Sequence, residues 1–192
     1  MQRPDEKKRQ GIVEAALKLF ATRPFHEVRL EDVAAAAKVG KGTVYIYFKS
    51  KEHLYGSLIS EGFAQLVDGL KAQLDEDGQS SWDALRKIVR EAVRFSVAHP
   101  YVYKLMRIGG AEDHTEAALV AKRRELGKLV EGVIRRGVRR GEISDPHPEL
   151  TAQFVPACVR AATLYGPRDV TEDVLVNHVM RVLGEGLARR ER

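Results

Sequence analysis

Apolar residues recur at intervals of three and four along most of the chain, which is the pattern of amphipathic helices. In the first such stretch, over residues 5–21, Asp5 can cap the start and Pro24 cannot continue the helix. Further stripes predict helices over residues 30–37, 50–74, 82–98 (capped by Ser81), 100–108, 115–140, 148–165 and 171–189. The pattern therefore predicts an all-α fold.

The breaks between these helices have specific residues. Gly141 suits a left-handed C-cap, and Pro148 suits the first turn of its helix. Pro156 lies in mid-helix and predicts a kink. A cluster of arginines precedes Gly141, where cations complement the helix dipole, so we do not interpret them as a second nucleic-acid site. They are Arg135, Arg136, Arg139 and Arg140.

One segment does not have the composition of a helix. Residues 43–48, Thr-Val-Tyr-Ile-Tyr-Phe, are β-branched or aromatic and taken alone indicate a strand. No other segment offers a partner strand. As a helix, the segment places Val44 and Phe48 toward the core and leaves Thr43, Tyr45 and Tyr47 largely at the surface. We therefore predict a helix here, with exposed aromatic side chains suited to binding.

The order is then helix 30–37, turn 38–40 and helix 41–48, which is helix-turn-helix geometry. The charge of the chain supports this prediction. Residues 1–56 contain eleven Lys/Arg against seven Asp/Glu, whereas the remainder contains twenty-one against twenty. A basic N-terminal unit suits a polyanion, although by charge alone a solvated basic face is the more common explanation.

The sequence Val39-Gly40-Lys41-Gly42-Thr43-Val44-Tyr45-Ile46-Tyr47-Phe48-Lys49-Ser50-Lys51-Glu52-His53-Leu54, with residues 30–34 before it, resembles the TetR/AcrR family of transcriptional regulators. The resemblance implies a three-helix DNA-binding unit over residues 1–53. It also implies an effector-binding and dimerisation bundle over residues 54–192. Together these make an all-α protein with an N-terminal helix-turn-helix and a C-terminal helical bundle.

Carried over position by position, the resemblance implies roles for individual residues. The expected DNA-binding residues are Arg29, Lys41, Gly42, Thr43, Tyr45, Tyr47 and Lys51. Among these, Lys51 is expected to meet a phosphate and Arg29 to replace a phosphate-contacting hydroxyl. Two departures stand out: Lys38 holds a turn position that is usually glycine, and Gly40 replaces a Ser/Thr cap, as Val28-Arg29 does for the preceding helix.

The helical body is expected to bind a small-molecule effector. Apolar or amphipathic side chains on its central helices are the candidate contacts, with Arg107 as an anchor for an acidic group, although each is more often ordinary core. The candidates are Trp82, Phe95, Tyr103, Met106, Arg107, Phe154 and Cys158. The last two helices are expected to form a homodimer through Leu150, Phe154, Ala161, Val179, Leu183 and Leu187.

Other classes of protein fit the sequence less well. No apolar run approaches the ~18 residues of a membrane span, and no signal segment is evident, so we expect a cytoplasmic protein. No metal or other cofactor is expected. An enzyme would have to pair Cys158 with His99, His114, His147 or His178, but Cys158 lies on an apolar helix face. Catalysis is therefore not expected.

The expected function is that of a ligand-responsive transcriptional regulator, and specifically a repressor that leaves its double-stranded DNA operator when an effector binds. The alternative is an architectural or otherwise unregulated DNA-binding protein. Such a protein would not need about 140 helical residues beyond its DNA-binding unit.

Overall fold

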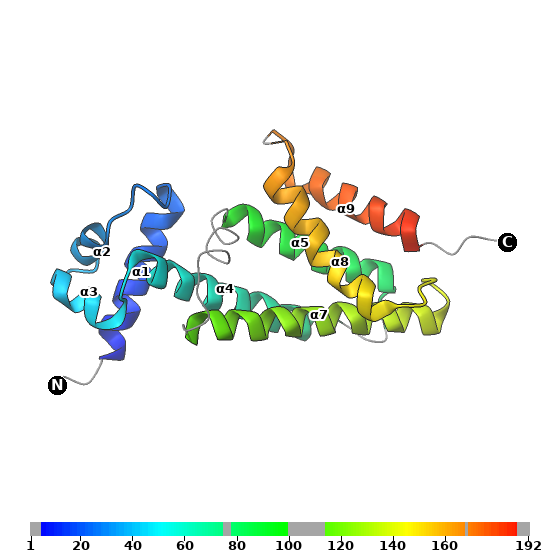
Figure 1. The fold of residues 1–192 in the computed structure, drawn as a ribbon, viewed down its shortest axis with the longest axis horizontal. Helices are drawn as coiled ribbons and strands as arrows, with labels where there is room; N and C mark the ends of the chain where they lie inside the picture. The colour runs from blue at the N-terminus through cyan, green and yellow to red at the C-terminus, as the bar shows by residue number, and fades with distance from the viewer. Residues whose placement is uncertain (1–4, 75–77, 100–113, 168, 188–192) are drawn as a thin grey trace. The chain divides into compact units, whose positions relative to one another are not determined.

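The computed structural model describes residues 5–74, 78–99, 114–167 and 169–187, and every regular element within them is an α-helix (Figure 1). The helices divide between two compact units, of which the first includes the described residues up to Gly62 together with residues 114–118, and the second includes those from Phe63 to His99 and from Leu119 onward. Helix α4 (Lys51–Gln73) contributes to both. The predicted all-α fold is confirmed, while the expected short helix over residues 100–108 lies outside the described residues.

The first unit packs α1 (Glu6–Thr22), α2 (Leu30–Ala36), α3 (Lys41–Tyr47) and the start of α4 around one apolar core. Asp5 caps α1 as predicted, because its carboxylate accepts the Lys7 N–H at 2.9 Å. The fully buried side chains of this core are Ile12, Ala16, Val28, Val33, Val44 and Leu54.

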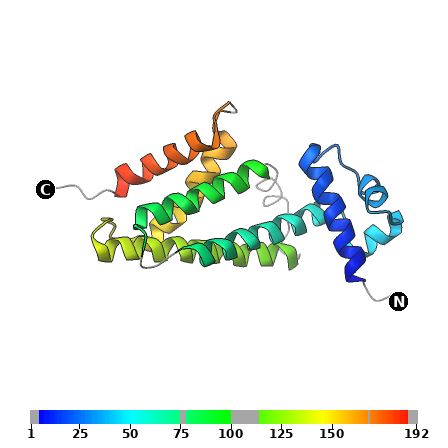
Figure 2. The same ribbon diagram turned by 180° about the vertical axis from the view of Figure 1, so that it is seen from behind.

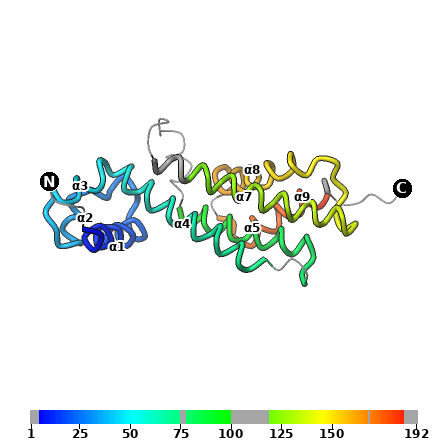
Figure 3. Tube along the Cα trace, turned by 90° about the horizontal axis from the view of Figure 1, so that it is seen from below, coloured from blue at the N-terminus to red at the C-terminus, as the bar shows by residue number. Residues whose placement is uncertain are grey.

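The second unit packs α5 (Ser81–Ala98) against both α8 (Pro148–Tyr165) and α9 (Glu172–Leu187), as Figures 1 and 2 show from opposite sides. Helix α7 (His114–Arg140) runs alongside the second half of α4 (Figure 3). Two ion pairs join these helices, from Lys71 to Glu125 and from Lys122 to Asp68, each at 2.9 Å.

Caps define the ends of the helices in this unit. Ser80, rather than the expected Ser81, caps α5: its hydroxyl accepts the Asp83 N–H at 3.1 Å, and Ser81 is already helical. Gly141 ends α7 with φ 71°, as predicted. The Glu142 N–H donates to the Gly137 carbonyl and the Gly141 N–H to the Val138 carbonyl, which is the Schellman pattern. Helix α8 continues through Pro156.

Candidate nucleic-acid interface

The turn between α2 and α3 is held by backbone hydrogen bonds. The Lys38 N–H donates to the Ala35 carbonyl at 3.1 Å and the Val39 N–H to the Ala34 carbonyl at 3.0 Å. These two hydrogen bonds can end α2 only if Lys38 adopts a left-handed backbone conformation. Lys38 does so, since its φ is 54°. The sequence had placed lysine where glycine is usual, and the structure shows that the turn keeps its geometry despite the side chain.

Replacing Lys38 by glycine is therefore expected to stabilise the protein. A side chain in the left-handed region costs roughly 1–2 kcal/mol, part of which glycine loses again through the entropy of the unfolded chain. We expect the free energy of unfolding in urea to rise by about 1 kcal/mol. The control Ala36→Gly, in the helical conformation just before the turn, is expected to lower it. A decrease in both variants would contradict this account of the turn.

Helix α3 buries one face and exposes the other. Val44 and Phe48 are buried against α1, α2 and α4, as the sequence predicted. On the opposite side Tyr45 is 46 % and Ile46 62 % exposed, next to the exposed Lys41 and Gly42. Thr43 is half-buried. An aromatic, an aliphatic and a cationic side chain are therefore exposed together on this face of α3.

Ile46 is a residue that the sequence reasoning missed. A helical wheel gives the signal, because Ile46 lies two positions from Val44 and two from Phe48, on the side opposite both. In a helix that reads the major groove, an aliphatic side chain there suits a thymine methyl group.

Lys41 already has a partner in the protein itself. Its ammonium forms an ion pair with Glu31 of α2 and lies 5.8 Å from the centre of the Tyr45 ring. The hydrogen bond between the two charged groups raises the pKa of Lys41 and lowers the pKa of Glu31, so the pair is fully charged at neutral pH. Glu31 therefore places a negative charge at the edge of an otherwise basic face.

Tyr47 is not a free surface residue, contrary to our expectation. Its ring is half-buried, its hydroxyl accepts the Asp5 N–H at 2.8 Å, and the same hydroxyl donates to the Asp5 carbonyl at 3.1 Å. Tyr47 thus fastens the end of α3 to the start of α1. The sequence did not reveal this contact because the two residues are far apart in the chain.

Lys51 also has a role within the unit. Its ammonium donates to the Phe25 carbonyl at 2.8 Å and lies 4.4 Å from the centre of the Phe25 ring. Phe25 belongs in turn to an aromatic cluster with Phe20 and Tyr55. Helix α4 starts beside it, where the Ser50 hydroxyl accepts the His53 N–H at 3.1 Å. Lys51 therefore connects α4 to the loop between α1 and α2.

Arg29 precedes α2 as its N-cap residue. Its backbone N–H donates to the Asp32 carboxylate at 3.1 Å, and its side chain is exposed. The guanidinium forms no ion pair with any residue that the structure describes. Among the expected DNA-binding residues, it is a cation available to an external anion.

The four expected effector contacts that the structure describes, Trp82, Phe95, Phe154 and Cys158, lie at different places in the second unit. Trp82 begins α5, where its indole N–H donates to the Glu142 carbonyl at 3.1 Å, while Phe95 lies near the other end of α5 against Phe63, at 5.4 Å between ring centres. Phe154 is 60 % exposed on α8. Tyr103, Met106 and Arg107 lie outside the described residues.

Cys158 lines a shallow apolar groove of about 490 Å³ between α8 and α9. His178 lines the same groove, so one of the four histidines weighed for an enzyme is near the cysteine. No group of His, Cys, Asp and Glu in the described part of the chain is arranged to hold a metal ion. Within those same ranges no helix is long and apolar enough to cross a membrane.

Two of the residues expected at a dimer interface are core residues instead. Val179 is 2 % and Leu183 6 % exposed, because this face of α9 packs within its own unit. Nothing is described of the Leu187 side chain. Ala161 is exposed, as expected of an interface residue, and the large apolar residues that α8 and α9 expose among the described side chains are Leu150, Phe154, Leu164, Tyr165, Val174 and Val182.

Known proteins share both parts of this architecture. Residues 12–58 match the family model of bacterial regulatory proteins of the tetR family, and residues 78–164 match that of a tetracyclin repressor-like C-terminal domain. The HTH-type transcriptional regulator YhgD of Bacillus subtilis is 30 % identical over 147 residues, which cover 73 % of this chain and 74 % of the relative. The fatty acid metabolism regulator protein of Bacillus subtilis is 23 % identical over 70 % of each chain.

Solved structures show the same fold. The transcriptional regulator FadR from Bacillus subtilis, in complex with stearoyl-CoA, superposes with a TM-score of 0.72 at 19 % identity, covering 93 % of this chain and 98 % of that one. A TetR/AcrR regulator from Thermobifida fusca superposes with a TM-score of 0.77 at 21 % identity, covering 97 % and 100 %. With its helix-turn-helix, its matching terminal domain and its relatives among HTH-type regulators, the chain belongs to the TetR family of DNA-binding transcriptional regulators.

Proposed function

We propose that this protein is a homodimeric repressor that leaves its operator when a small organic molecule binds to its helical body. The observation that carries the proposal is the exposed face of α3, where aromatic, aliphatic and cationic side chains lie together on the second helix of a helix-turn-helix. Residues 1–53 would bind the DNA, and residues 54–192 would bind the effector and the partner subunit.

In this proposal α3 enters the major groove. Thr43, Tyr45 and Ile46 meet base edges, and Gly42 lets the backbone approach the DNA, since nothing in the protein lies within 4 Å of a Cβ built there. Lys41 exchanges its ion pair with Glu31 for a contact with the DNA. Tyr47 contributes by fixing the end of α3 through Asp5.

Phosphates are proposed to be bound at two places beside α3. The exposed guanidinium of Arg29 suits a bidentate contact with phosphate oxygens. Lys51 stands in the first turn of α4, where free N–H groups favour an anion. Because the Lys51 ammonium also holds the Phe25 carbonyl, we expect Lys51→Ala to weaken both DNA binding and the folding of the first unit.

The dimer is proposed to form through the exposed apolar residues of α8 and α9. A palindromic operator contains two equivalent half-sites, separated by about 34 Å for each helical turn of DNA between them. The two α3 helices that contact these half-sites must therefore be held at a fixed spacing. A two-fold dimer provides this spacing, and it presents the same patch from each subunit.

The effector is proposed to act through α4. Leu54 and Leu58, in its first turns, belong to the core of the first unit, and Val67 and Leu70, in its second half, belong to the core of the second unit. We propose that a ligand which displaces the second half of α4 also displaces the first half. An effector that binds better to the spacing unsuited to DNA would release the operator. Phe95, Tyr103, Met106 and Arg107 remain our proposed contacts, with Trp82 at the other end of α5.

The complex of FadR with stearoyl-CoA makes acyl thioesters the first class of effector to test. An operator selected from a random pool of duplex DNA is expected to be a palindrome. An effector at ~100 times its Kd should stabilise the free protein by ~2.7 kcal/mol, as measured by a shift in thermal unfolding. The factor by which it weakens operator binding must equal the factor by which the operator weakens effector binding.

The control is a duplex of scrambled sequence, whose weak binding the effector should alter far less. A protein that selects an operator but neither gains stability nor loses the operator with acyl thioesters, aromatic acids or dyes would favour the alternative of an unregulated DNA-binding protein. A protein that selects no sequence at all would overturn the assignment of α3.

A further inference from the structure

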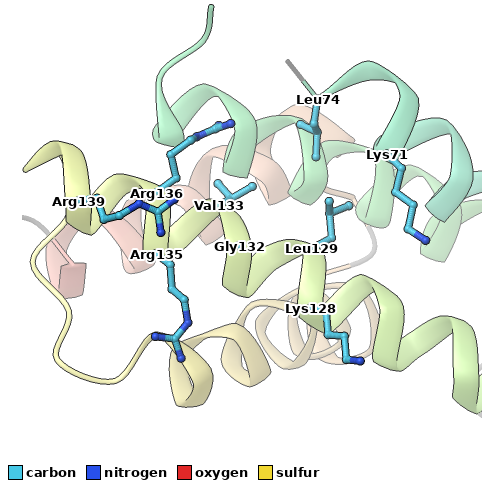
Figure 4. A pocket seen from close by; sticks show the side chains of 9 residues that line it. All are labelled: Lys71, Leu74, Lys128, Leu129, Gly132, Val133, Arg135, Arg136 and Arg139. Atoms are coloured by element: carbon cyan, nitrogen blue, oxygen red, sulfur yellow. The ribbon is translucent and has the colours of Figure 1, made fainter. Parts of the chain in front are cut away.

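A pocket of about 490 Å³ lies between α4 and α7 in the second unit, and none of the residues proposed above for the effector is among its lining residues (Figure 4). Its wall carries five cationic side chains and, among the residues that the structure describes, no acidic one. The lining residues are Lys71, Leu74, Lys128, Leu129, Gly132, Val133, Arg135, Arg136 and Arg139. A concave site of this size suits a small organic molecule.

Four of the cations lie on the second half of α7. Lys128, Arg135, Arg136 and Arg139 recur at intervals close to whole helical turns and all border the pocket, with Arg135 and Arg136 leaving the helix in opposite directions (Figure 4). Cations near the last turn of a helix are favoured by its dipole, but that effect fades within a turn. Lys128 lies three turns before the end of α7, so the dipole does not account for it.

The carboxylates around the pocket compensate only part of this charge. Lys71 pairs with Glu125 at 2.9 Å, and Arg135 pairs both with Glu131 at 2.7 Å and with Glu149 of α8 at 3.2 Å. By contrast, Lys128 and Arg139 are exposed and form no ion pair within the described ranges. Arg136, at 9 % exposure, is buried at this site and has an interaction partner of its own, so the uncompensated charge is that of Lys128 and Arg139. Like charges at helical spacing repel one another, so an anion would be bound favourably here.

The floor of the pocket is apolar. Leu74 directly follows the end of α4, whereas Leu129 and Val133 come from α7. Gly132 leaves the space open, since a Cβ built on it would meet nothing within 4 Å. A ligand for this pocket therefore combines several negative charges with an apolar group. Guanidinium groups in particular suit phosphate oxygens, which they bind in a bidentate manner.

We propose that the pocket between α4 and α7 binds a small organic anion in which two or more phosphate groups are joined to an apolar group. The phosphates contact Lys128 and Arg139, supported by Arg135 and Arg136, and the apolar group lies on Leu74 and Leu129. The site lies in the second unit, and its occupancy is measured on the protein without DNA.

The test is calorimetric titration of the full chain with geranyl diphosphate and with inorganic pyrophosphate at low ionic strength. Both probes are expected to bind, geranyl diphosphate more tightly. The double variant Lys128→Gln/Arg139→Gln is expected to weaken both by about tenfold or more, since charge-assisted contacts are lost. Leu74→Ala should weaken only geranyl diphosphate.

A matched control is available on the same helix. Arg123 and Arg124 are also exposed and without an ion pair in the described ranges, but they line the neighbouring surface instead, so Arg123→Gln/Arg124→Gln makes the same change of net charge. It should alter neither affinity by more than about twofold. Gly132→Leu keeps every charge, fills the pocket and favours the helix, and it should abolish binding of both probes.

Three results would overturn the proposal. One is that neither probe binds. This result is expected if the acidic residues 75–77, which follow Leu74 in the sequence, neutralise the cations. Another is that both double variants weaken binding equally, which would indicate diffuse attraction rather than a site. The third is that Lys128→Gln/Arg139→Gln weakens binding to duplex DNA while leaving both probes unaffected, which would make this face a nucleic-acid contact.

Discussion

Replacing Thr43 and Tyr45 together by alanine is expected to abolish the preference for the operator over unrelated DNA. Each contact with a base edge is worth ~1–3 kcal/mol, and a dimer makes each contact twice. Even at the lower limit the double variant loses about 4 kcal/mol of discrimination, close to three orders of magnitude in the affinity ratio. Titrations of the selected operator and of a scrambled duplex, followed by gel shift, measure this ratio directly.

The fold should survive this change, because Tyr45 is exposed and only Thr43 is half-buried. Circular dichroism should therefore give the same helical content for the variant and the parent. An unaltered affinity ratio in a folded variant would show that α3 does not read the sequence.

Tyr47 provides a control substitution on α3 at a side chain that contacts the protein itself. Tyr47→Phe removes only the hydroxyl that bonds Asp5, so it should lower stability by about 1 kcal/mol and leave the affinity ratio nearly unchanged. This reverses the role that the sequence first suggested for Tyr47. A loss of operator preference without a loss of stability would restore that first role.

The elements could be predicted from the sequence because each has a regular apolar stripe and capping or breaking residues. Residues 43–48 were the exception, since their composition favours a strand, and the helix there depends on Val44 and Phe48 finding a core made by other helices. Lys38 was recognised as an unusual turn residue, and its φ of 54° has the sign that a glycine position would have.

The missing parts of the prediction depend on contacts between distant segments. No local pattern shows that Tyr47 bonds Asp5 or that the Lys51 ammonium bonds the Phe25 carbonyl. Helix α9 illustrates the same limit for packing. Its apolar stripe is so wide that periodicity does not tell Leu183, which packs inward, from Val182, which is 47 % exposed.

For that reason the dimer is best tested at Phe154 and Val182, not at Leu183, whose replacement by glutamate would place a charge in the core of the subunit itself. Phe154→Glu/Val182→Glu is expected to yield a folded monomer. Central apolar side chains in an interface contribute about 2 kcal/mol or more each, and a two-fold interface contains each of them twice. The loss of roughly 8 kcal/mol raises the dissociation constant by more than five orders of magnitude.

Sedimentation velocity at micromolar concentration distinguishes the two states, and Val97→Glu provides the matched control. Val97 is 45 % exposed on α5, nearly the same fraction as Val182, so the same substitution there tests for a general effect of adding a carboxylate to an apolar surface. We expect Val97→Glu to remain dimeric and to bind the operator normally. The monomeric variant should lose the operator as well, because nothing then holds two α3 helices one or more turns of DNA apart. If Val97→Glu dissociates and Phe154→Glu/Val182→Glu does not, the interface includes α5 instead of the exposed faces of α8 and α9.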